Sequence, residues 1–143
     1  MPAECPLHAN LLIQNGETKR AQEIYKQIIN RDPLTPADAV LSAYGRSFLI
    51  TGEFDFAIQY FLKSNQVSSK VAANWTNLAI AYTAKVETDK AVLAVAEVKK
   101  LNPNANLATL TFAFKPMSAS PPSYKEWFEK KYLPLYRKAG LPE

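Results

Sequence analysis

An internal repeat constrains the fold of this chain more than any other feature. Three segments align without gaps: QNGETKRAQEIYKQIINRDP, ITGEFDFAIQYFLKSNQVSS and AKVETDKAVLAVAEVKKLNP. The alignment places Ala21, Ala57 and Ala91 in register, with offsets of 57 − 21 = 36 and 91 − 57 = 34 residues. A period of about 34 residues is typical of a repeat built from two helices. We therefore expect a stack of helical hairpins, with the two extra residues in the connection at 33–37.

The spacing of apolar residues within each unit supports helices. They recur three or four positions apart, and no run alternates in twos as a half-buried strand would. The first helix of the second unit is expected to begin near Thr35, whose side chain would cap it. Pro36 would then occupy the first helical position and Asp38 the first turn.

The turn inside each hairpin also has a sequence signal. Gly16 and Gly52 stand where the chain must reverse, and glycine tolerates the positive φ that such turns use. The third unit has Val86 at this place. This substitution predicts a modified turn in the third hairpin, and not a missing one.

Small residues mark the places where helices can approach closely. Gly45 and Ala79 are the small residues of the first helices, and Ala57 and Ala91 those of the second. Large side chains must fill the space around these contacts, so we assign the large residues of the first helices to the core. They are Leu41, Tyr44, Phe48, Trp75, Leu78 and Tyr82.

The third unit carries the fullest version of one helical-repeat pattern, in the residues Trp75, Leu78, Ala79, Tyr82, Ala91, Val95, Val98 and Pro103. In these residues the chain resembles the tetratricopeptide repeat family. The second unit matches the pattern less fully, and the first has Pro6 inside its first helix, which should shorten that helix. Three units in register make the resemblance specific.

The resemblance implies an all-α fold: a right-handed α-solenoid of about three tetratricopeptide hairpins, a partial fourth first-helix and a C-terminal capping helix. We expect a single domain over 1–143. Its parts are repeats at about 2–33, 36–69 and 70–103, a partial repeat at 104–115, a linker at 115–120 and a C-terminal helix at 121–139.

The fourth unit begins but does not finish. Leu107, Phe112 and Ala113 restart the pattern, and Pro116 stands where the next aromatic residue should be. The sequence therefore predicts a short fourth first-helix that is cut off before its partner forms.

A helix rich in aromatic residues is predicted to follow. It would start with a cap at Ser120 and Pro121 and end at Gly140, and Pro134 should bend it. A repeat array needs a terminal element to cover its last exposed face, and this helix is the natural candidate. The apolar and aromatic residues on one of its sides are Tyr124, Trp127, Phe128, Tyr132, Leu135 and Ala139.

The last residues, YLPLYRKAGLPE, resemble the C-terminal ends of bacterial proteins in which a tetratricopeptide array follows a nucleotide cyclase or a transcriptional regulatory domain. That second resemblance implies a regulatory C-terminal domain of a larger bacterial signalling protein. It is the alternative to a stand-alone interaction module.

Enzymatic motifs are absent from the sequence. The four glycines form no phosphate-binding loop. Cys5 and His8 lie three residues apart, but a nucleophile needs an orienting third group and a metal needs three or four ligands, and the chain has no other cysteine or histidine. We expect no enzymatic activity, no metal and no cofactor.

A binding surface remains as the source of function. The first helices of tetratricopeptide units line a concave side, so the resemblance implies a groove that binds a partner peptide or protein. A solvated face, or a groove filled by the chain's own tail, is the alternative. Asn10 alone matches the residues that clamp a terminal carboxylate in some family members, so we expect no such clamp. The groove residues would be Asn10, Gln14, Ser42, Arg46, Leu49, Ile50, Thr76, Asn77, Ile80 and Thr83.

Charge and hydropathy narrow the partners further. The formal net charge is +4, too small and too dispersed for nucleic-acid binding to be expected. No stretch approaches the about 18 apolar residues of a membrane helix, and the N-terminus lacks a secretion signal, so we expect a cytoplasmic protein without a membrane partner. Five aromatic residues in the C-terminal helix suggest a possible homo-oligomer formed through that helix.

Overall fold

The computed structural model describes residues 6–32 and 37–143, and within these ranges all regular structure is helical. The predicted all-α class is therefore confirmed. Thr35 and Pro36, which were predicted to open the second unit, lie outside the described residues, as does Cys5. Asp38 is the first residue of its helix, in agreement with its predicted place in the first turn.

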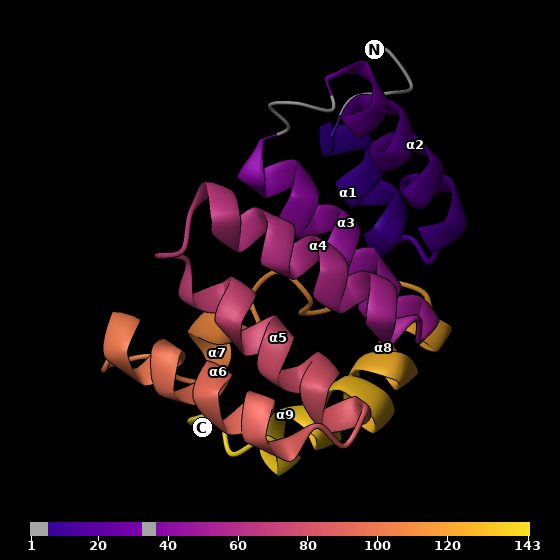
Figure 1. The fold of residues 1–143 in the computed structure, drawn as a ribbon. Helices are drawn as coiled ribbons and strands as arrows, with labels where there is room; N and C mark the ends of the chain where they lie inside the picture. Colours follow the sequence, from indigo (N-terminus) through magenta and orange to yellow (C-terminus); the bar gives the residue numbers. More distant parts are fainter. Residues whose placement is uncertain (1–5, 33–36) are drawn as a thin grey trace.

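Three helical hairpins form the body of the molecule. Within the hairpins α1 packs on α2, α3 on α4 and α5 on α6; between them, α2 packs on α3 and α4 on α5. The first helices α1, α3 and α5 also contact one another in turn, so they form the inner layer of the stack (Figure 1). The bounds are α1 Pro6–Gln14, α2 Thr18–Arg31, α3 Asp38–Thr51, α4 Phe54–Val67, α5 Ala72–Ala84 and α6 Thr88–Leu101.

The described part of the first helix, α1, has 9 residues, whereas α3 has 14. Pro6 is the first of these residues, and proline is tolerated in the first turn of a helix because its missing N–H would have no partner there. The shortening expected from Pro6 stays a prediction, since residues 1–5 lie outside the described ranges.

All three hairpin turns use a left-handed residue. Gly16 has φ +81°, Gly52 has φ +79° and Val86 has φ +60°. In each turn, the N–H of the residue after the left-handed one donates to a carbonyl near the end of the first helix. One example is the hydrogen bond from the Glu87 N–H to the Tyr82 carbonyl at 2.9 Å. The third turn is thus the modified turn that the sequence predicts: the geometry is kept and a β-branched residue adopts it.

The helices cross closely at the predicted small residues. Ala57 is fully buried and Ala91 nearly so. Gly45 faces the ring of Phe61, and a Cβ added at Gly45 would lie 2.8 Å from two ring carbons. No real Cβ is accommodated at that distance, so α3 and α4 can cross here only because residue 45 has no side chain.

The large residues of the first helices pack as predicted, with a difference in degree. Leu41, Tyr44, Phe48 and Leu78 are buried, while Trp75 and Tyr82 are half-buried and pack against the core from its edge. The Trp75 indole donates to the Ser69 carbonyl at 2.8 Å, so its polar end has a partner.

A chain of buried hydrogen bonds joins three helices. The Ser42 hydroxyl of α3 donates to Asn74 Oδ1 of α5 at 2.5 Å, and the Asn74 amide donates to Ser64 Oγ of α4 at 2.8 Å. The Ser64 hydroxyl then donates to the Asp38 carbonyl at 3.0 Å. Buried polar side chains are costly without partners. This series of buried hydrogen bonds therefore fixes the second and third hairpins in one relative position.

The fourth first-helix is cut off as predicted. Helix α7, Leu107–Leu110, is a single turn whose first residues are held by a reciprocal cap between Asn106 and Thr109. The sequence predicts that Phe112 continues the repeat pattern of the first helices, but its side chain is 80% exposed. Because the helix ends before that residue, Phe114 turns inward in its place and is buried.

The C-terminal helix is continuous but not uniform. It consists of α8, Pro122–Trp127, a π-helical turn η1, Phe128–Tyr132, and α9, Leu133–Lys138. Pro134 has no N–H and its ring would crowd the carbonyl four residues earlier. The π turn lies directly before it, with the Leu133 N–H bonded to the Phe128 carbonyl five residues back. The predicted irregularity at Pro134 therefore appears as a widened turn.

Two predictions about this helix need correction. Ser120 does not cap it: its hydroxyl accepts from the Met117 N–H at 3.0 Å, and Pro121 occupies the cap position without a side-chain bond. Nor does the helix cover the outer face of the last repeat, where Val92 and Leu93 of α6 remain 60% and 69% exposed. Its α9 segment packs against α5 in the inner layer, which offers more apolar surface (Figure 1).

Gly45→Ala is predicted to destabilise the fold. The added methyl group would overlap Phe61, which costs about 1–3 kcal/mol, and the better helix propensity of alanine returns about 1 kcal/mol. Urea unfolding should therefore show a lower free energy of unfolding. Phe61→Leu should make room, so the double variant should lose less than the sum of the two single losses. Simple additivity would contradict the close contact.

Val86→Gly is predicted to stabilise the fold. A left-handed conformation costs an L-residue about 1–2 kcal/mol, and glycine avoids most of this cost while losing some unfolded-state entropy. Because the valine side chain is 77% exposed, little packing is lost. We expect a gain of about 1 kcal/mol in the free energy of unfolding by urea titration. Val86→Ala, the matched control, keeps the strain, and equal stability of the two variants would contradict this explanation.

Candidate partner-binding site

The C-terminal segment covers most of the concave side. After α7 the chain crosses to the first hairpin, where the Ser120 hydroxyl donates to Gln14 Oε1 at 3.3 Å and Pro121 lies over Gly16. The chain then returns along the inner layer as α8, η1 and α9. On this return Tyr132 donates to Asn77 Oδ1 at 3.4 Å. The segment thus contacts both the first and the third hairpin.

Rings from the C-terminal segment fill the space above the inner helices. The Phe114 ring lies 4.5 Å from that of Tyr132 and 5.7 Å from that of Trp127, measured between centroids. The Tyr124 hydroxyl donates to the Phe114 carbonyl at 2.8 Å. Tyr124, Phe114 and Tyr132 are all at most 3% exposed. The segment is therefore packed as a core element.

Several of the predicted groove residues are used inside the protein. Gln14 donates to the Ala113 carbonyl at 3.4 Å, and Asn10 accepts a hydrogen bond from the Tyr25 hydroxyl. The Thr76 and Thr83 hydroxyls donate to carbonyls of their own helix, at 3.0 Å and 2.7 Å. Ser42 donates to Asn74, and Asn77 accepts from Tyr132 of the C-terminal helix, so these side chains too have partners within the protein.

Arg46 lies in the middle of the inner layer. Its Nη1 donates to Ser42 Oγ at 3.1 Å, which connects it to the buried hydrogen-bond chain. Burial lowers the pKa of its guanidinium, while interaction with the hydroxyls of Tyr25, Tyr132 and Tyr124 raises it. Within residues 6–32 and 37–143 no carboxylate pairs with it. Arg46 is thus bonded to Ser42 within the inner layer, close enough to the packed tyrosines for their hydroxyls to affect its charge. Its predicted role in binding a partner stays a prediction.

Burial also raises the pKa of several core tyrosines. It raises the pKa of Tyr25 and of Tyr136 to about 12, and it also raises the pKa of Tyr124 and of Tyr132. A buried phenolate is poorly solvated, so the neutral form is favoured. These hydroxyls stay protonated at neutral pH and act as hydrogen-bond donors.

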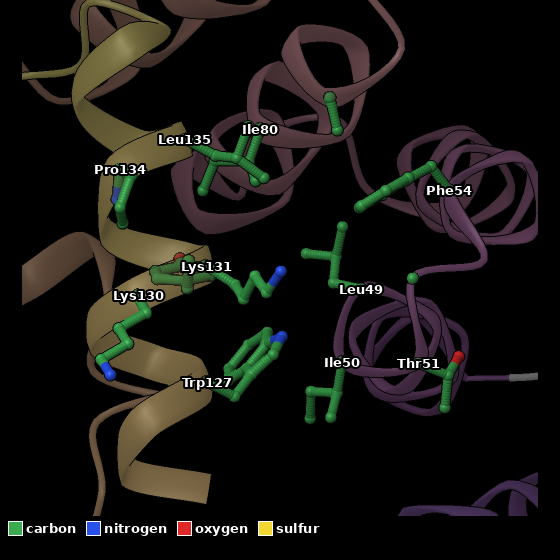
Figure 2. A pocket seen from close by; sticks show the side chains of 13 residues that line it. Leu49, Ile50, Thr51, Phe54, Ile80, Trp127, Lys130, Lys131, Pro134 and Leu135 are labelled. Carbon is green, nitrogen blue, oxygen red and sulfur yellow. The ribbon is translucent and has the colours of Figure 1, made fainter. Parts of the chain in front are cut away.

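One part of the concave side stays open as a pocket of about 590 Å³. This volume falls in the usual range of binding pockets. Three predicted groove residues, Leu49, Ile50 and Ile80, lie in its wall (Figure 2). The complete lining is Leu49, Ile50, Thr51, Gly52, Phe54, Ile80, Ala84, Trp127, Lys130, Lys131, Tyr132, Pro134 and Leu135.

The wall on the repeat side is built by the end of α3 and by α5. Helix α3 stops at Gly52, whose N–H bonds to the Leu49 carbonyl at 3.3 Å. The chain then turns away, so Leu49 and Ile50 are left at the rim of the inner layer. Ile80 faces them from α5 in Figure 2, and the Thr51 hydroxyl already donates to the Phe48 carbonyl. This wall is therefore almost wholly apolar.

The opposite wall is one stripe of the C-terminal helix. Trp127, Lys131 and Leu135 all line the pocket, so the widened turn between them still leaves them on one side of the helix. In Figure 2 the Lys131 ammonium and the indole nitrogen of Trp127 point across the pocket toward Leu49 and Ile50. The Lys130 ammonium points away from it in the same view. The pocket thus combines an apolar floor with two nitrogen donors on one side.

Positive charge dominates the surroundings of the pocket. No acidic residue lines it. Two carboxylates that adjoin lining residues in the sequence have partners: Glu53 pairs with Lys19 at 3.2 Å and Glu126 with Lys130 at 3.1 Å. Lys131 has no ion-pair partner in the part of the chain that the structure describes.

The sequence did not identify the second wall of this pocket. The sequence predicts Trp127 and Leu135 on one side of a capping helix, Pro134 at its bend and Lys131 on a solvated face. The pattern gives no information on where a helix outside the repeats will dock. A signal was present nonetheless. The four-residue spacing of an aromatic, a lysine and a leucine marks a mixed face, and a purely structural cap would need no lysine there.

The described residues offer neither a metal site nor a membrane-spanning helix. Within the described ranges no group of three or more His, Cys, Asp or Glu side chains could hold a metal ion. Nor does any described helix have the length and apolar content needed to cross a bilayer. The four tyrosine and phenylalanine rings of the C-terminal helix that were expected to mediate self-association are at most 9% exposed: Tyr124, Phe128, Tyr132 and Tyr136. Self-association through this helix stays a prediction, with Trp127 as its half-buried aromatic residue.

Comparison with known proteins supports the fold. No model of a known protein family matches the chain, and no curated protein matches it in sequence. Solved structures do match. "MamA MSR-1 C2" has a TM-score of 0.64 at 18% identity, over 98% of this chain and 76% of that chain. "MamA AMB-1 P212121" has a TM-score of 0.62 at 17% identity, over 94% of this chain and 69% of that chain.

This likeness shows the fold: MamA is a tetratricopeptide repeat protein, and the chain has the predicted tetratricopeptide solenoid. The second resemblance, of the C-terminal residues to nucleotide cyclases and transcriptional regulators, finds no support in these structures. The repeat boundaries predicted from the sequence stay predictions, and the helix bounds above are those of the structure.

Stability is predicted to fall above pH 10. The folded pKa of Tyr25 is raised from 10.0 to about 12, so its contribution is complete below pH 10 and is lost as the pH rises through 12. In this window Tyr25 alone should lower the free energy of unfolding by up to about 1.4 kcal/mol per pH unit. Urea unfolding at a series of pH values measures the slope. Tyr25→Phe should reduce the slope, and a pH-independent free energy up to pH 12 would contradict the burial of these hydroxyls.

Proposed function

We propose that the chain is a non-enzymatic protein–protein interaction module that binds a protein partner or a segment of one at the open pocket of its concave side. The observation that supports this proposal is the pocket between Leu49, Ile80 and the Trp127–Leu135 stripe. An apolar cleft of this size, edged by a few polar groups, is a common form of binding site.

The proposal narrows the predicted groove. A full-length groove would present the inner faces of α1, α3 and α5, but the C-terminal segment packs on much of that surface. A partner that avoids displacing this segment has access to Leu49, Ile50 and Ile80. The other predicted residues then support the site: Ser42, Arg46 and Asn77 hold the inner layer and the C-terminal helix in place.

The fold makes an interaction role reasonable. Tetratricopeptide solenoids stack helix pairs into a curved surface suited to binding. That inference comes from the fold, and function must be argued from the site. The pocket supplies the site-level argument, because no described cluster of side chains offers catalytic or metal chemistry in its place.

Ile50→Asn is predicted to abolish partner binding. The residue is half-buried in the pocket wall, so a polar amide of similar size removes the apolar contact with a small cost in stability. The measurement is affinity purification of the tagged chain from extract of its native host, with the bound proteins quantified by mass spectrometry. We expect bound partners to fall at least about tenfold relative to wild type.

Val92→Asn is the matched control. It makes a similar change on α6, at a residue that is 60% exposed and does not line the pocket. It should bind as the wild type does. Partners that stay bound to Ile50→Asn, or that are lost equally from both variants, would contradict the proposed site.

A further inference from the structure

We infer that the pocket selects an acidic amphipathic peptide segment, one that places an apolar side chain next to an Asp or Glu carboxylate. This inference rests on the proposed function, since it names the chemistry of the partner that the pocket accepts. It is carried by the arrangement of two nitrogen donors over an apolar floor (Figure 2).

The apolar half of the occupant follows from the floor. Leu49 and Ile80 are nearly fully buried, and Ile50, Phe54 and Leu135 are half-buried around them. A leucine, isoleucine, methionine or phenylalanine side chain entering between α3 and the C-terminal helix would cover these groups. The surface that it would remove from water belongs mainly to the half-buried Ile50, Phe54 and Leu135, and this burial supplies the affinity of an anchor residue.

The acidic half follows from the opposite wall. The Lys131 ammonium extends across the pocket in Figure 2 and has no ion-pair partner in the described residues. The Trp127 indole N–H points the same way and makes no hydrogen bond within the described structure. Both nitrogens point into the pocket in this view, so a carboxylate of a bound segment would find donors there.

The charges around the pocket favour the same partner. Glu53, Glu126 and Asp55 adjoin lining residues in the sequence, and each is paired with a lysine, Lys19, Lys130 and Lys85 respectively. Glu129 also adjoins a lining residue, but no acidic residue lines the pocket itself. Lys131 is therefore the lining charge that has no ion-pair partner in the described residues. A basic segment would be repelled, and a neutral one would leave the ammonium without a partner over an apolar surface.

A peptide fits the pocket better than a small metabolite. The lining offers few polar groups to orient a compact polar ligand, because the Thr51 hydroxyl is already bonded to Phe48. The pocket also lies between two helices along one edge, so an extended or helical segment can cross it while one anchor enters.

The test begins with a random library of peptides of about twelve residues, fused to a phage coat protein through their C-termini so that no free terminal carboxylate is present. The library is selected on the full chain. We expect the enriched peptides to carry Asp or Glu within about four residues of a large apolar residue. Enrichment of neutral or basic peptides would overturn the inference.

The enriched peptide is then synthesised, and its Kd is measured by fluorescence anisotropy with three variants. Lys131→Glu should weaken binding at least about tenfold, because attraction becomes repulsion. Lys138→Glu makes the same change of charge on the same helix outside the pocket lining, and it should change the Kd less than about twofold. Equal Kd values for these two variants would overturn the inference.

Ile50→Asn separates this inference from the proposed function. If the peptide depends on Ile50 but not on Lys131, the pocket binds partners and the acidic preference is wrong. If the selection enriches nothing, or the enriched peptide binds Ile50→Asn as well as wild type, the pocket is not a docking site and both proposals fail. Circular dichroism of each variant confirms that it is folded.

Discussion

The approach of α3 to α4 at Gly45 is the contact on which the rest of the structure depends. The Phe61 ring occupies the space of the missing side chain, and this lets the second hairpin close tightly in the middle of the array. The first hairpin packs on one side of this unit and the third on the other. The buried chain from Ser42 through Asn74 to Ser64 then fixes the third hairpin against the second. Without the close crossing, α3 would not present Leu49 and Ile50 beside Ile80, and the pocket would lose a wall.

The C-terminal segment turns an open repeat array into a structure with a defined site. Its rings occupy the inner side, where Tyr124 and Tyr132 lie near enough to Arg46, together with Tyr25, to affect its charge. The π turn before Pro134 sets the direction of the final helical turns. The pocket is therefore a joint product of a repeat, which supplies the apolar floor, and of a non-repeat helix, which supplies the Trp127 and Lys131 nitrogens.

The sequence predicted the repeats well because their signals are local. Register, small residues and turn residues each act over one or two helical turns, and even the exception at Val86 was placed correctly. The position of the C-terminal helix could not be predicted in this way. Its docking depends on contacts between residues about a hundred positions apart, such as Gln14 and Ser120. Contacts at this separation leave no repeating pattern in the sequence. The candidate site was therefore half predicted: Leu49, Ile50 and Ile80 were named, and the wall that faces them was not.

The hydrogen bond between Gln14 and Ser120 limits how a protein with this fold can evolve. Solenoids commonly lengthen by duplicating a unit, because each unit touches only its neighbours. Here the segment after the last unit reaches back to the first, so a duplicated hairpin would move its two anchor points apart by about 10 Å for each helix added. An added hairpin would therefore break the contact between the C-terminal segment and the first hairpin, and the array would gain binding surface only at that cost. The length of the C-terminal segment that returns to the first hairpin thus limits the number of hairpins. Sequence variation is then expected mainly among the residues that line the pocket.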